Sequence, residues 1–136
     1  MPSKILVVDD EAPVRDMFKD LLKKHDYQVY PVATGEEALE AIAKETFEAV
    51  LLDVKLTGIS GLETLKIIKE RKPDMIVIMI TGFGYDEELV AKSNEYGCSG
   101  YIGKNAPISQ IISCFKEFIK GAKENKMCDD KQGKVE

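Results

Sequence analysis

Apolar residues along this 136-residue chain alternate between two spacings. Unbroken apolar runs, typical of strands buried on both faces, lie within the predicted strands at residues 4–8, 49–52 and 75–80, with weaker strand patterns at 27–32 and 101–102. Between them, apolar residues recur at helical spacing over residues 13–22, 35–42, 61–68, 86–96 and 107–119. Strict alternation of strand and helix predicts an α/β domain with a parallel sheet and helices on both of its faces.

Two of the predicted helices begin with a capping sequence. Thr34 is followed three residues later by Glu37, and Ser60 is followed in the same way by Glu63. In such a pair the hydroxyl accepts a backbone N–H of the first turn, and the carboxylate reaches back to the backbone before the helix. The pairs predict where the second and third helices begin.

Charged or polar residues follow four of the five predicted strands. Asp9 and Asp10 come after the first strand, Asp53 after the third, Thr81 ends the fourth, and Lys104 follows the fifth. In open parallel sheets, ligands bind beyond the carboxyl ends of the strands, so we expect these five side chains to converge. Each alone has a plainer interpretation, such as a helix cap, a turn residue or a solvated lysine. Their common position at one edge of the sheet favours a chemical site.

The expected cluster of three carboxylates indicates which chemistry that site would support. Two like charges about 4 Å apart repel by about 4 kcal/mol at an effective dielectric constant near 20. A raised carboxyl pKa or a bound cation relieves this repulsion. Oxygen ligands without a nearby His or Cys favour Mg²⁺ or Mn²⁺. Lys104 and Thr81 suit the oxygens of a phosphoryl group, and one carboxylate could attack phosphorus as a nucleophile.

Four segments of the chain resemble the receiver domain of two-component response regulators, and the resemblance spans residues 3–122. The matching segments are residues 5–11, residues 51–54 with Gly58 and Gly61, residues 78–82, and residues 100–104. The resemblance implies a flavodoxin-like (βα)5 three-layer fold with a five-stranded parallel sheet of order 2-1-3-4-5. It also implies a signalling switch that is activated by phosphorylation, rather than an enzyme that acts on other molecules.

The same resemblance implies a role for each acidic residue. Asp53 matches the phosphoacceptor, which takes its phosphoryl group from the phosphohistidine of a sensor histidine kinase or from a small acyl phosphate. Asp9 and Asp10 match the acidic pair that holds Mg²⁺ (or Mn²⁺), with Asp53 and the backbone carbonyl of Lys55 as further ligands.

The resemblance also implies how the signal leaves the site. Thr81 and Lys104 match the residues that contact the phosphoryl group. Tyr101 matches an aromatic switch residue that turns inward when the threonine hydroxyl moves toward the phosphate, although an aromatic on a short strand is also a common core residue. The helix at 86–96 has the weakest apolar face, so we expect it to be the easiest to displace. The partner surface is expected on the fourth helix, fifth strand and fifth helix.

Two departures from the family pattern, and two positions that vary within the family, affect the expected site. Asn105 follows Lys104 where the family usually has proline, often after a cis peptide. A cis bond before Asn105 would cost about 2.5–4 kcal/mol, so we expect a trans or unusually shaped loop. Thr57 also stands where proline is usual. Lys55 and Phe83 occupy positions that influence hydrolysis of the acyl phosphate, and we expect their charge and bulk to slow the attack of water.

Composition places these features in one globular domain. Hydrophobic residues make up 44% and charged residues 32% of the chain, which excludes a disordered or collagen-like protein. The net charge of −5 argues against direct nucleic-acid binding. No segment resembles a signal peptide or a membrane span, and three cysteines without Cys-x-x-Cys spacing suggest reduced thiols, so we expect a cytoplasmic protein. The charged residues 123–136 predict a tail without regular structure.

Two other functions remain open from the residues alone. A phosphatase of the haloacid dehalogenase type would use Asp9 as its nucleophile, but the expected Asp-x-Asp spacing is missing because Glu11 follows Asp10. A receiver-like module could instead bind its partner without phosphorylation. For a true receiver the expected partners are a sensor histidine kinase and a downstream protein or effector domain, with a phosphorylation-linked homodimer as an option.

Overall fold

The structure is a computed structural model that describes residues 3–82 and 87–120 together with the backbone of residues 126–128. Its elements follow one another as β1 (Ser3–Val8), α1 (Ala12–Lys23), β2 (Tyr27–Val32), α2 (Gly35–Lys44), β3 (Ala49–Asp53), α3 (Gly61–Arg71), β4 (Ile76–Thr81), α4 (Glu87–Glu95), β5 (Gly100–Gly103), α5 (Ile108–Lys120) and β6 (Lys126–Cys128).

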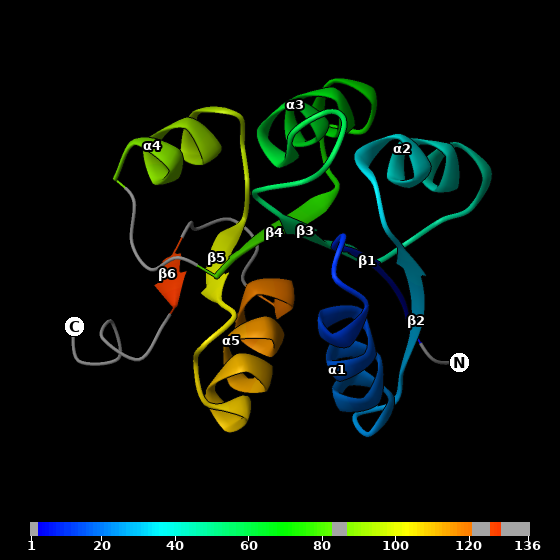
Figure 1. The fold of residues 1–136 in the computed structure, drawn as a ribbon, viewed down its shortest axis with the longest axis vertical. Helices are drawn as coiled ribbons and strands as arrows, with labels where there is room; N and C mark the ends of the chain where they lie inside the picture. Colours follow the sequence, from blue (N-terminus) through cyan, green and yellow to red (C-terminus); the bar gives the residue numbers. More distant parts are fainter. Residues whose placement is uncertain (1–2, 83–86, 121–125, 129–136) are drawn as a thin grey trace.

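The strands form one parallel sheet in the order β2-β1-β3-β4-β5-β6. Helices α2, α3 and α4 cover one face, and α1 and α5 cover the other (Figure 1). The first five strands have the order 2-1-3-4-5, which confirms the predicted flavodoxin-like fold. The short β6 pairs with β5 at the end of the sheet, and the sequence pattern did not predict it.

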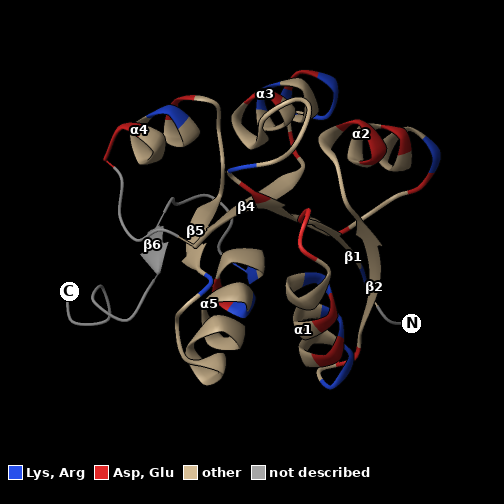
Figure 2. Ribbon diagram, viewed as in Figure 1, with Lys and Arg blue, Asp and Glu red and all other residues tan. Residues whose placement is uncertain are grey.

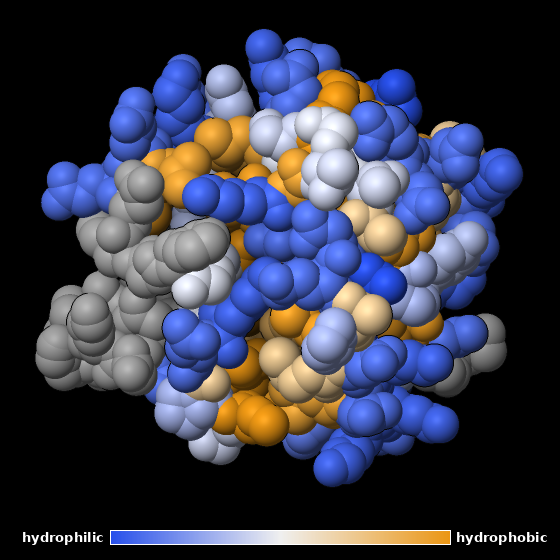
Figure 3. All heavy atoms as spheres, viewed as in Figure 1, coloured by the Kyte–Doolittle hydropathy of each residue, from blue (hydrophilic) through white to orange (hydrophobic). Residues whose placement is uncertain are grey.

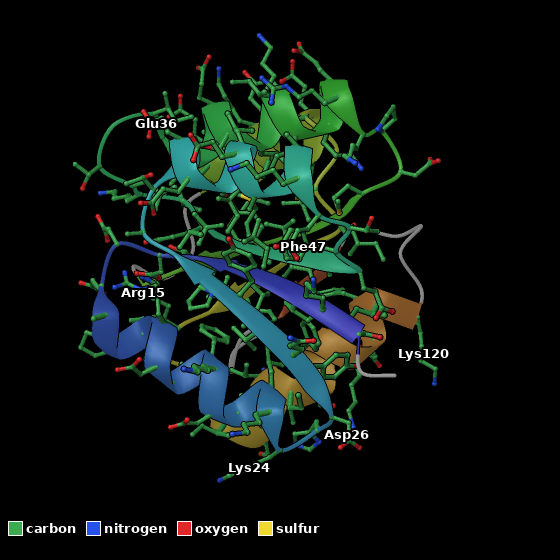
Figure 4. All side chains as sticks on the ribbon, turned by 90° about the vertical axis from the view of Figure 1, so that its right-hand side faces the viewer. Arg15, Lys24, Asp26, Glu36, Phe47 and Lys120 are labelled. Carbon is green, nitrogen blue, oxygen red and sulfur yellow. The ribbon has the colours of Figure 1, made fainter. Side chains whose placement is uncertain are left out.

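The three-layer arrangement follows from the alternation of side chains along the buried strands. Successive residues of a strand point to opposite faces. In β1, Leu6 and Val8 therefore belong to the core beneath α2, α3 and α4, whereas Ile5 and Val7 belong to the core beneath α1 and α5. The side view shows Phe47, which is 5% exposed, between the sheet and the first of these helix layers (Figure 4).

Both predicted capping sequences start the helices as expected. Thr34 Oγ1 accepts the backbone N–H of Glu37 at 3.1 Å, and Ser60 Oγ accepts that of Glu63 at 3.1 Å. The Glu37 carboxylate in turn accepts the backbone N–H of Ala33 at 2.8 Å. Each bond satisfies an amide that the helix itself leaves without a partner, so the caps fix the first turns of α2 and α3.

Of the two cysteines for which the structure gives a bonding state, one agrees with the expectation of reduced thiols and one does not. Cys98 is a free thiol buried beneath α4. Burial raises its pKa to about 11, so the thiol stays protonated and unreactive near neutral pH. Cys114 on α5, however, is disulfide-bonded, which makes the expectation wrong at that position. Among the described residues, no helix has the length and apolar character needed to cross a bilayer.

Candidate functional site

The sheet register brings three aspartates to one point. Asp53 ends β3 at the centre of the sheet, and Asp9 and Asp10 directly follow the neighbouring strand β1. One carboxylate oxygen from each lies within 4.8 Å of the others. Figure 2 shows the acidic turn between β1 and α1 at the middle of the sheet. Asp9 and Asp53 are buried, whereas Asp10 is exposed, so two of the three charges are shielded from water.

Lys104 supplies the positive charge that this cluster needs. Its ammonium nitrogen lies 2.8 Å from Asp9 Oδ2, 3.2 Å from Asp53 Oδ2 and 3.7 Å from Glu11 Oε1. Burial lowers the pKa of Lys104, but the nearby Asp9 and Asp53 raise it by more, so the net pKa lies above the ordinary lysine value. The lysine is therefore a permanent cation beside the carboxylates.

The electrostatics of Asp53 remain strained despite this ion pair. Burial and the negative charge of Asp9 raise the pKa of Asp53 from 3.8 to about 6. Lys104 and the backbone N–H of Lys55, 3.3 Å from Asp53 Oδ1, act in the opposite direction but do not cancel the increase. An additional cation would therefore stabilise the charged form of Asp53.

Asp9 is not the N-cap residue of α1. Glu11 occupies the N-cap position, and its side chain makes no capping bond. Asp9 Oδ1 accepts the backbone N–H of Glu11 at 2.9 Å, and its carbonyl accepts from Arg15 at 2.6 Å. Arg15 projects from the start of α1 (Figure 4).

The surroundings of the second carboxylate oxygen of Asp9 indicate whether the site suits a bound cation. Oδ2 is buried and accepts no hydrogen bond of good geometry from the described residues, although Lys104 pairs with its charge. Lys104 offsets only one of the charges of the three neighbouring aspartates, so an additional cation would lower the cost of burying this oxygen. Together with Asp10 and Asp53 it forms an all-oxygen donor set, which fits the Mg²⁺ site typical of receiver domains.

A pocket of about 570 Å³ opens over these residues. Its lining includes Asp10, Asp53, Lys55, Lys104, Val14 and Met17. The space-filling view shows hydrophilic residues across the centre of this face and apolar side chains below them, between α1 and α5 (Figure 3). A small phosphodonor or an approaching protein side chain that enters this pocket can therefore meet Asp10 and Asp53, which line it.

Thr81 and Tyr101, the two residues expected to carry the switch, lie on adjacent strands. Thr81 is buried at the end of β4, and its carbonyl accepts the backbone N–H of Lys104 at 2.7 Å. Tyr101 is 3% exposed and belongs to the core beneath α4 rather than to the acidic pocket. Its hydroxyl lies 2.9 Å from the hydroxyl of Ser93 on α4.

The departures from the family pattern have local structural consequences. The Lys104–Asn105 peptide is trans. The Asn105 side chain reaches the carbonyl of Gly82 at 3.5 Å. Thr57 donates its hydroxyl hydrogen bond to Asp10 Oδ2 at 3.1 Å, which ties the loop after β3 to the acidic cluster. Phe83 lies outside the described residues.

Sequence reasoning overlooked three residues near the site. Arg15 holds the Asp9 carbonyl, Glu11 faces Lys104, and Ser93 meets Tyr101. The positions of Glu11 and Arg15 weakly indicated a role at the site, because both lie at the start of a helix that follows the acidic pair. Ser93 was more clearly indicated, because it is a small polar residue on the helix with the weakest apolar pattern.

Comparison with known proteins matches this geometry to a family. The model of the response regulator receiver domain matches residues 5–116. The chain is 33% identical over 119 residues to the sporulation initiation phosphotransferase F of Bacillus subtilis (strain 168), covering 88% of this chain and 95% of that protein. It is also 33% identical over 115 residues to the hydrogenase transcriptional regulatory protein HoxA of Cupriavidus necator, covering 85% of this chain but only 24% of that longer protein.

A solved structure agrees with the sequence matches. The CheY-like response regulator receiver domain protein from Methanospirillum hungatei JF-1 superimposes with a TM-score of 0.84 at 31% identity, covering 90% of this chain and 97% of that one. These matches favour the receiver interpretation over the dehalogenase-type phosphatase. The chain belongs to the response regulator receiver domain family of two-component systems, and its pocket of Asp9, Asp10 and Asp53 fits a phosphoacceptor site.

Proposed function

We propose that this chain is a signalling switch in which Asp53 accepts a phosphoryl group from the phosphohistidine of a sensor histidine kinase. Small acyl phosphates would serve as alternative donors. The observation that carries the proposal is the convergence of three carboxylate oxygens within 4.8 Å, with the Lys104 ammonium 3.2 Å from Asp53 Oδ2. Asp9, Asp10, Asp53 and the carbonyl of Lys55 are the proposed ligands of Mg²⁺ (or Mn²⁺).

The residues of the pocket divide the chemistry between them. An oxygen of Asp53 attacks phosphorus, a P–O bond forms as the bond to the donor breaks, and the product is an acyl phosphate. Lys104 exchanges its contact with Asp53 for one with a phosphoryl oxygen, and the Thr81 hydroxyl approaches another. A bound Mg²⁺ supplies charge neutralisation for the phosphoryl oxygens. The chain assists its own phosphorylation and dephosphorylation and acts on no separate substrate.

The output is proposed to be a change in the surface formed by α4, β5 and α5. Phosphorylation concentrates negative charge and strong acceptor oxygens at Asp53. The response of Thr81 and Tyr101 would carry that change to α4. Proposed recipients are a downstream protein, an effector domain like those of longer relatives, or a second copy of this chain. We place this activity in the cytoplasm, with no direct binding of nucleic acid or membrane.

Lys55 and Phe83 are proposed to prolong the life of the phosphorylated state. Lys55 lines the pocket beside Asp53, where its charged side chain can occupy the approach of an attacking water molecule. For Phe83 the proposal depends on its sequence position alone, two residues after Thr81.

The intact mass of the protein after incubation with acetyl phosphate tests the proposed function. The wild type should gain one phosphoryl group in the presence of Mg²⁺ and none with excess chelator, and Asp53→Asn should gain none. Asp16→Asn, which alters an exposed carboxylate on α1, is the matched control and should behave as wild type.

Two outcomes would contradict the proposal. Phosphorylation that persists in Asp53→Asn but disappears in Asp9→Asn would identify the dehalogenase-type nucleophile. A folded wild type that gains no phosphoryl group from acetyl phosphate or from any phosphorylated histidine kinase would indicate a module that works without phosphorylation.

A further inference from the structure

The three acidic residues of the pocket are held in different ways. Asp9 and Asp53 are buried, and both pair with the Lys104 ammonium. Asp10 is exposed, and its carboxylate accepts a hydrogen bond from the Thr57 hydroxyl, 3.1 Å from Oδ2. Among the described residues this is the one hydrogen bond to the Asp10 side chain. The hydrogen-bonded hold on Asp10 therefore comes from the loop that follows β3.

The charges of the cluster act against the inward position of Asp10. One of its carboxylate oxygens lies within 4.8 Å of oxygens of Asp9 and Asp53. Like charges at this distance repel, and an exposed carboxylate can relieve the repulsion by rotating into water. A hydroxyl that donates to the carboxylate opposes this rotation, because a charge-assisted bond would be lost. Thr57 thus keeps a candidate metal ligand in place before a cation arrives.

The loop that carries Thr57 is itself held by hydrogen bonds. At its base, the Gly61 backbone N–H donates to the Val54 carbonyl at 3.0 Å. Near its tip, the Ile59 backbone N–H donates to Glu36 Oε2 on α2 at 3.3 Å. These bonds restrict the loop around Thr57, so its hydroxyl can serve as an anchor.

The bond from Thr57 also joins two segments that carry proposed metal ligands. Asp10 follows β1, whereas Asp53 ends β3 and the carbonyl of Lys55 lies two residues further along the chain. Thr57 lies two residues beyond Lys55, so its bond to Asp10 links the two segments directly. Mg²⁺ demands near-ideal octahedral geometry, and ligands that are already aligned lose less freedom when the ion binds.

We propose that Thr57 is a positioning residue that holds Asp10 in the metal site and so tightens the binding of a divalent cation. The proposal rests on the proposed Mg²⁺-dependent phosphorylation of Asp53, and it adds a residue outside the ligand set. Proline, which is usual at this position in receiver domains, can restrict the loop but has no hydroxyl to hold Asp10. The departure at Thr57 therefore gives this chain a hold on its metal ligand that proline would not supply.

The binding of Mn²⁺, followed by the electron paramagnetic resonance signal of the free ion, tests the proposal without a phosphodonor. Thr57→Val keeps the size of the side chain and removes the hydroxyl. Its dissociation constant for Mn²⁺ should rise about ten-fold, the low end of the range for hydrogen-bond partners of metal ligands. Thr57→Ser keeps the hydroxyl and should bind as wild type. Thr57→Pro should bind as weakly as Thr57→Val.

Thr46→Val is the matched control. Thr46 is an exposed residue in the loop before β3, at the opposite end of that strand from Asp53. The same substitution at this position should leave the dissociation constant for Mn²⁺ unchanged.

The Mg²⁺ dependence of phosphorylation by acetyl phosphate separates metal binding from the chemical step. In Thr57→Val the Mg²⁺ concentration that gives half the maximal rate should rise by a factor similar to that for Mn²⁺ binding. The rate at saturating Mg²⁺ should equal that of wild type, because the substitution leaves Asp53, Thr81 and Lys104 in place.

Three results would overturn the proposal: Mn²⁺ binding by Thr57→Val equal to wild type, Mn²⁺ binding by Thr57→Pro equal to wild type, or binding by Thr57→Ser as weak as that of Thr57→Val. A wild type that binds Mn²⁺ but gains no phosphoryl group would contradict the proposed function alone.

The scalar couplings that report the χ1 angle of Asp10 need no metal ion. They should show one rotamer in the wild type and averaging between rotamers in Thr57→Val. If the wild type binds no Mn²⁺, the proposed metal site fails together with the tightening assigned to Thr57. The couplings still decide whether Thr57 holds Asp10 in the cluster.

Discussion

Helices α5 and α4 flank the same strand, β5, but they are attached to it very differently. Helix α5 buries Ile111, Cys114, Phe115 and Phe118 against the sheet. Its Phe118 ring packs so closely on Gly100 that a Cβ there would lie 2.5 Å from the ring. Helix α4 buries a single serine. One side of β5 is thus held by interlocking apolar groups, and the other by contacts that include the Ser93–Tyr101 hydroxyl pair and partly buried side chains.

This difference shows where a signal from the pocket can travel. Well-packed cores resist small displacements because many dispersion contacts must be broken together. A helix with few buried groups opens at a lower free energy and can be biased by a local change in charge. The acidic pocket lies at the carboxyl ends of the strands that both helices cover, so the same event should leave α5 in place and move α4.

The largest expected effect is on the free energy of unfolding, and it is found by replacing one apolar residue on each helix. Phe115→Ala on α5 should lower the free energy of unfolding by about 3–5 kcal/mol, because it removes a fully buried ring that also meets Tyr27 edge-on. Leu89→Ala on α4 should cost only about 1 kcal/mol, since Leu89 is partly buried. Urea unfolding followed by circular dichroism measures both. Equal losses in the two variants would contradict the contrast between the helices.

The sequence could predict the buried strands, the starts of two helices and the edge of the sheet that carries the site. Unbroken aliphatic runs predicted β1, β3 and β4, and hydroxyl–carboxylate pairs predicted where α2 and α3 begin, because these features depend on neighbours along the chain. The position of Asp9, Asp10, Asp53 and Lys104 after strands predicted one common edge, and the structure brings them there.

The sequence could not predict the contacts that depend on exact side-chain placement. The bonds from Arg15 to Asp9, from Thr57 to Asp10 and between Ser93 and Tyr101 join residues whose approach is set by helix rotation and loop path. No local pattern encodes these variables. The strand β6 was missed for a related reason, since three residues of a charged segment form a strand only because the edge of β5 accepts them.

The next effect in size is the free-energy cost of burying the charge of Asp53. We expect this cost to destabilise the whole fold and to leave the attachment of α4 unchanged. The pKa of Asp53 is about 6 in the folded protein against an ordinary value of 3.8, so between these values the folded state binds more protons than the unfolded state. The free energy of unfolding should therefore fall as pH rises from about 4 to 6, by about 3 kcal/mol for a shift of this size. Urea unfolding without divalent cations measures this slope.

Asp53→Asn isolates the contribution of this one carboxylate. At pH 7 the variant should be more stable than wild type by up to about 3 kcal/mol, and the difference should vanish well below pH 3.8, where Asp53 is protonated in both the folded and the unfolded state. Asp16→Asn should keep the wild-type slope. Amide exchange of α4 should stay the same in Asp53→Asn, and a large change there would mean that the pocket and α4 are already coupled without phosphorylation.

The smallest effect is expected from Lys55, which follows the central strand β3 and lies on the fixed side of the pocket. Lys55→Ala should shorten the half-life of the phosphorylated protein two- to five-fold, because it opens a path for water toward the acyl phosphate. This corresponds to about 1 kcal/mol in activation free energy. Lys55→Met keeps much of the bulk and removes the charge, so a half-life restored to the wild-type value would assign the effect to bulk. Phosphate release after removal of the phosphodonor measures the half-life.

Combining Lys55→Ala with Ser93→Ala sharpens the contrast between the two regions. The Val54 backbone N–H donates to the Ile80 carbonyl at 3.0 Å, so the chain leading to Lys55 is tied to β4. Ser93→Ala removes the hydroxyl that meets Tyr101. If this loosening of α4 also changes the half-life, and if it is independent of water access at Lys55, the effects of the two substitutions should multiply. A double variant that decays at the rate of one single variant would instead show that Lys55 controls hydrolysis through the position of α4, and the division into a fixed and a movable side would fail at the pocket itself.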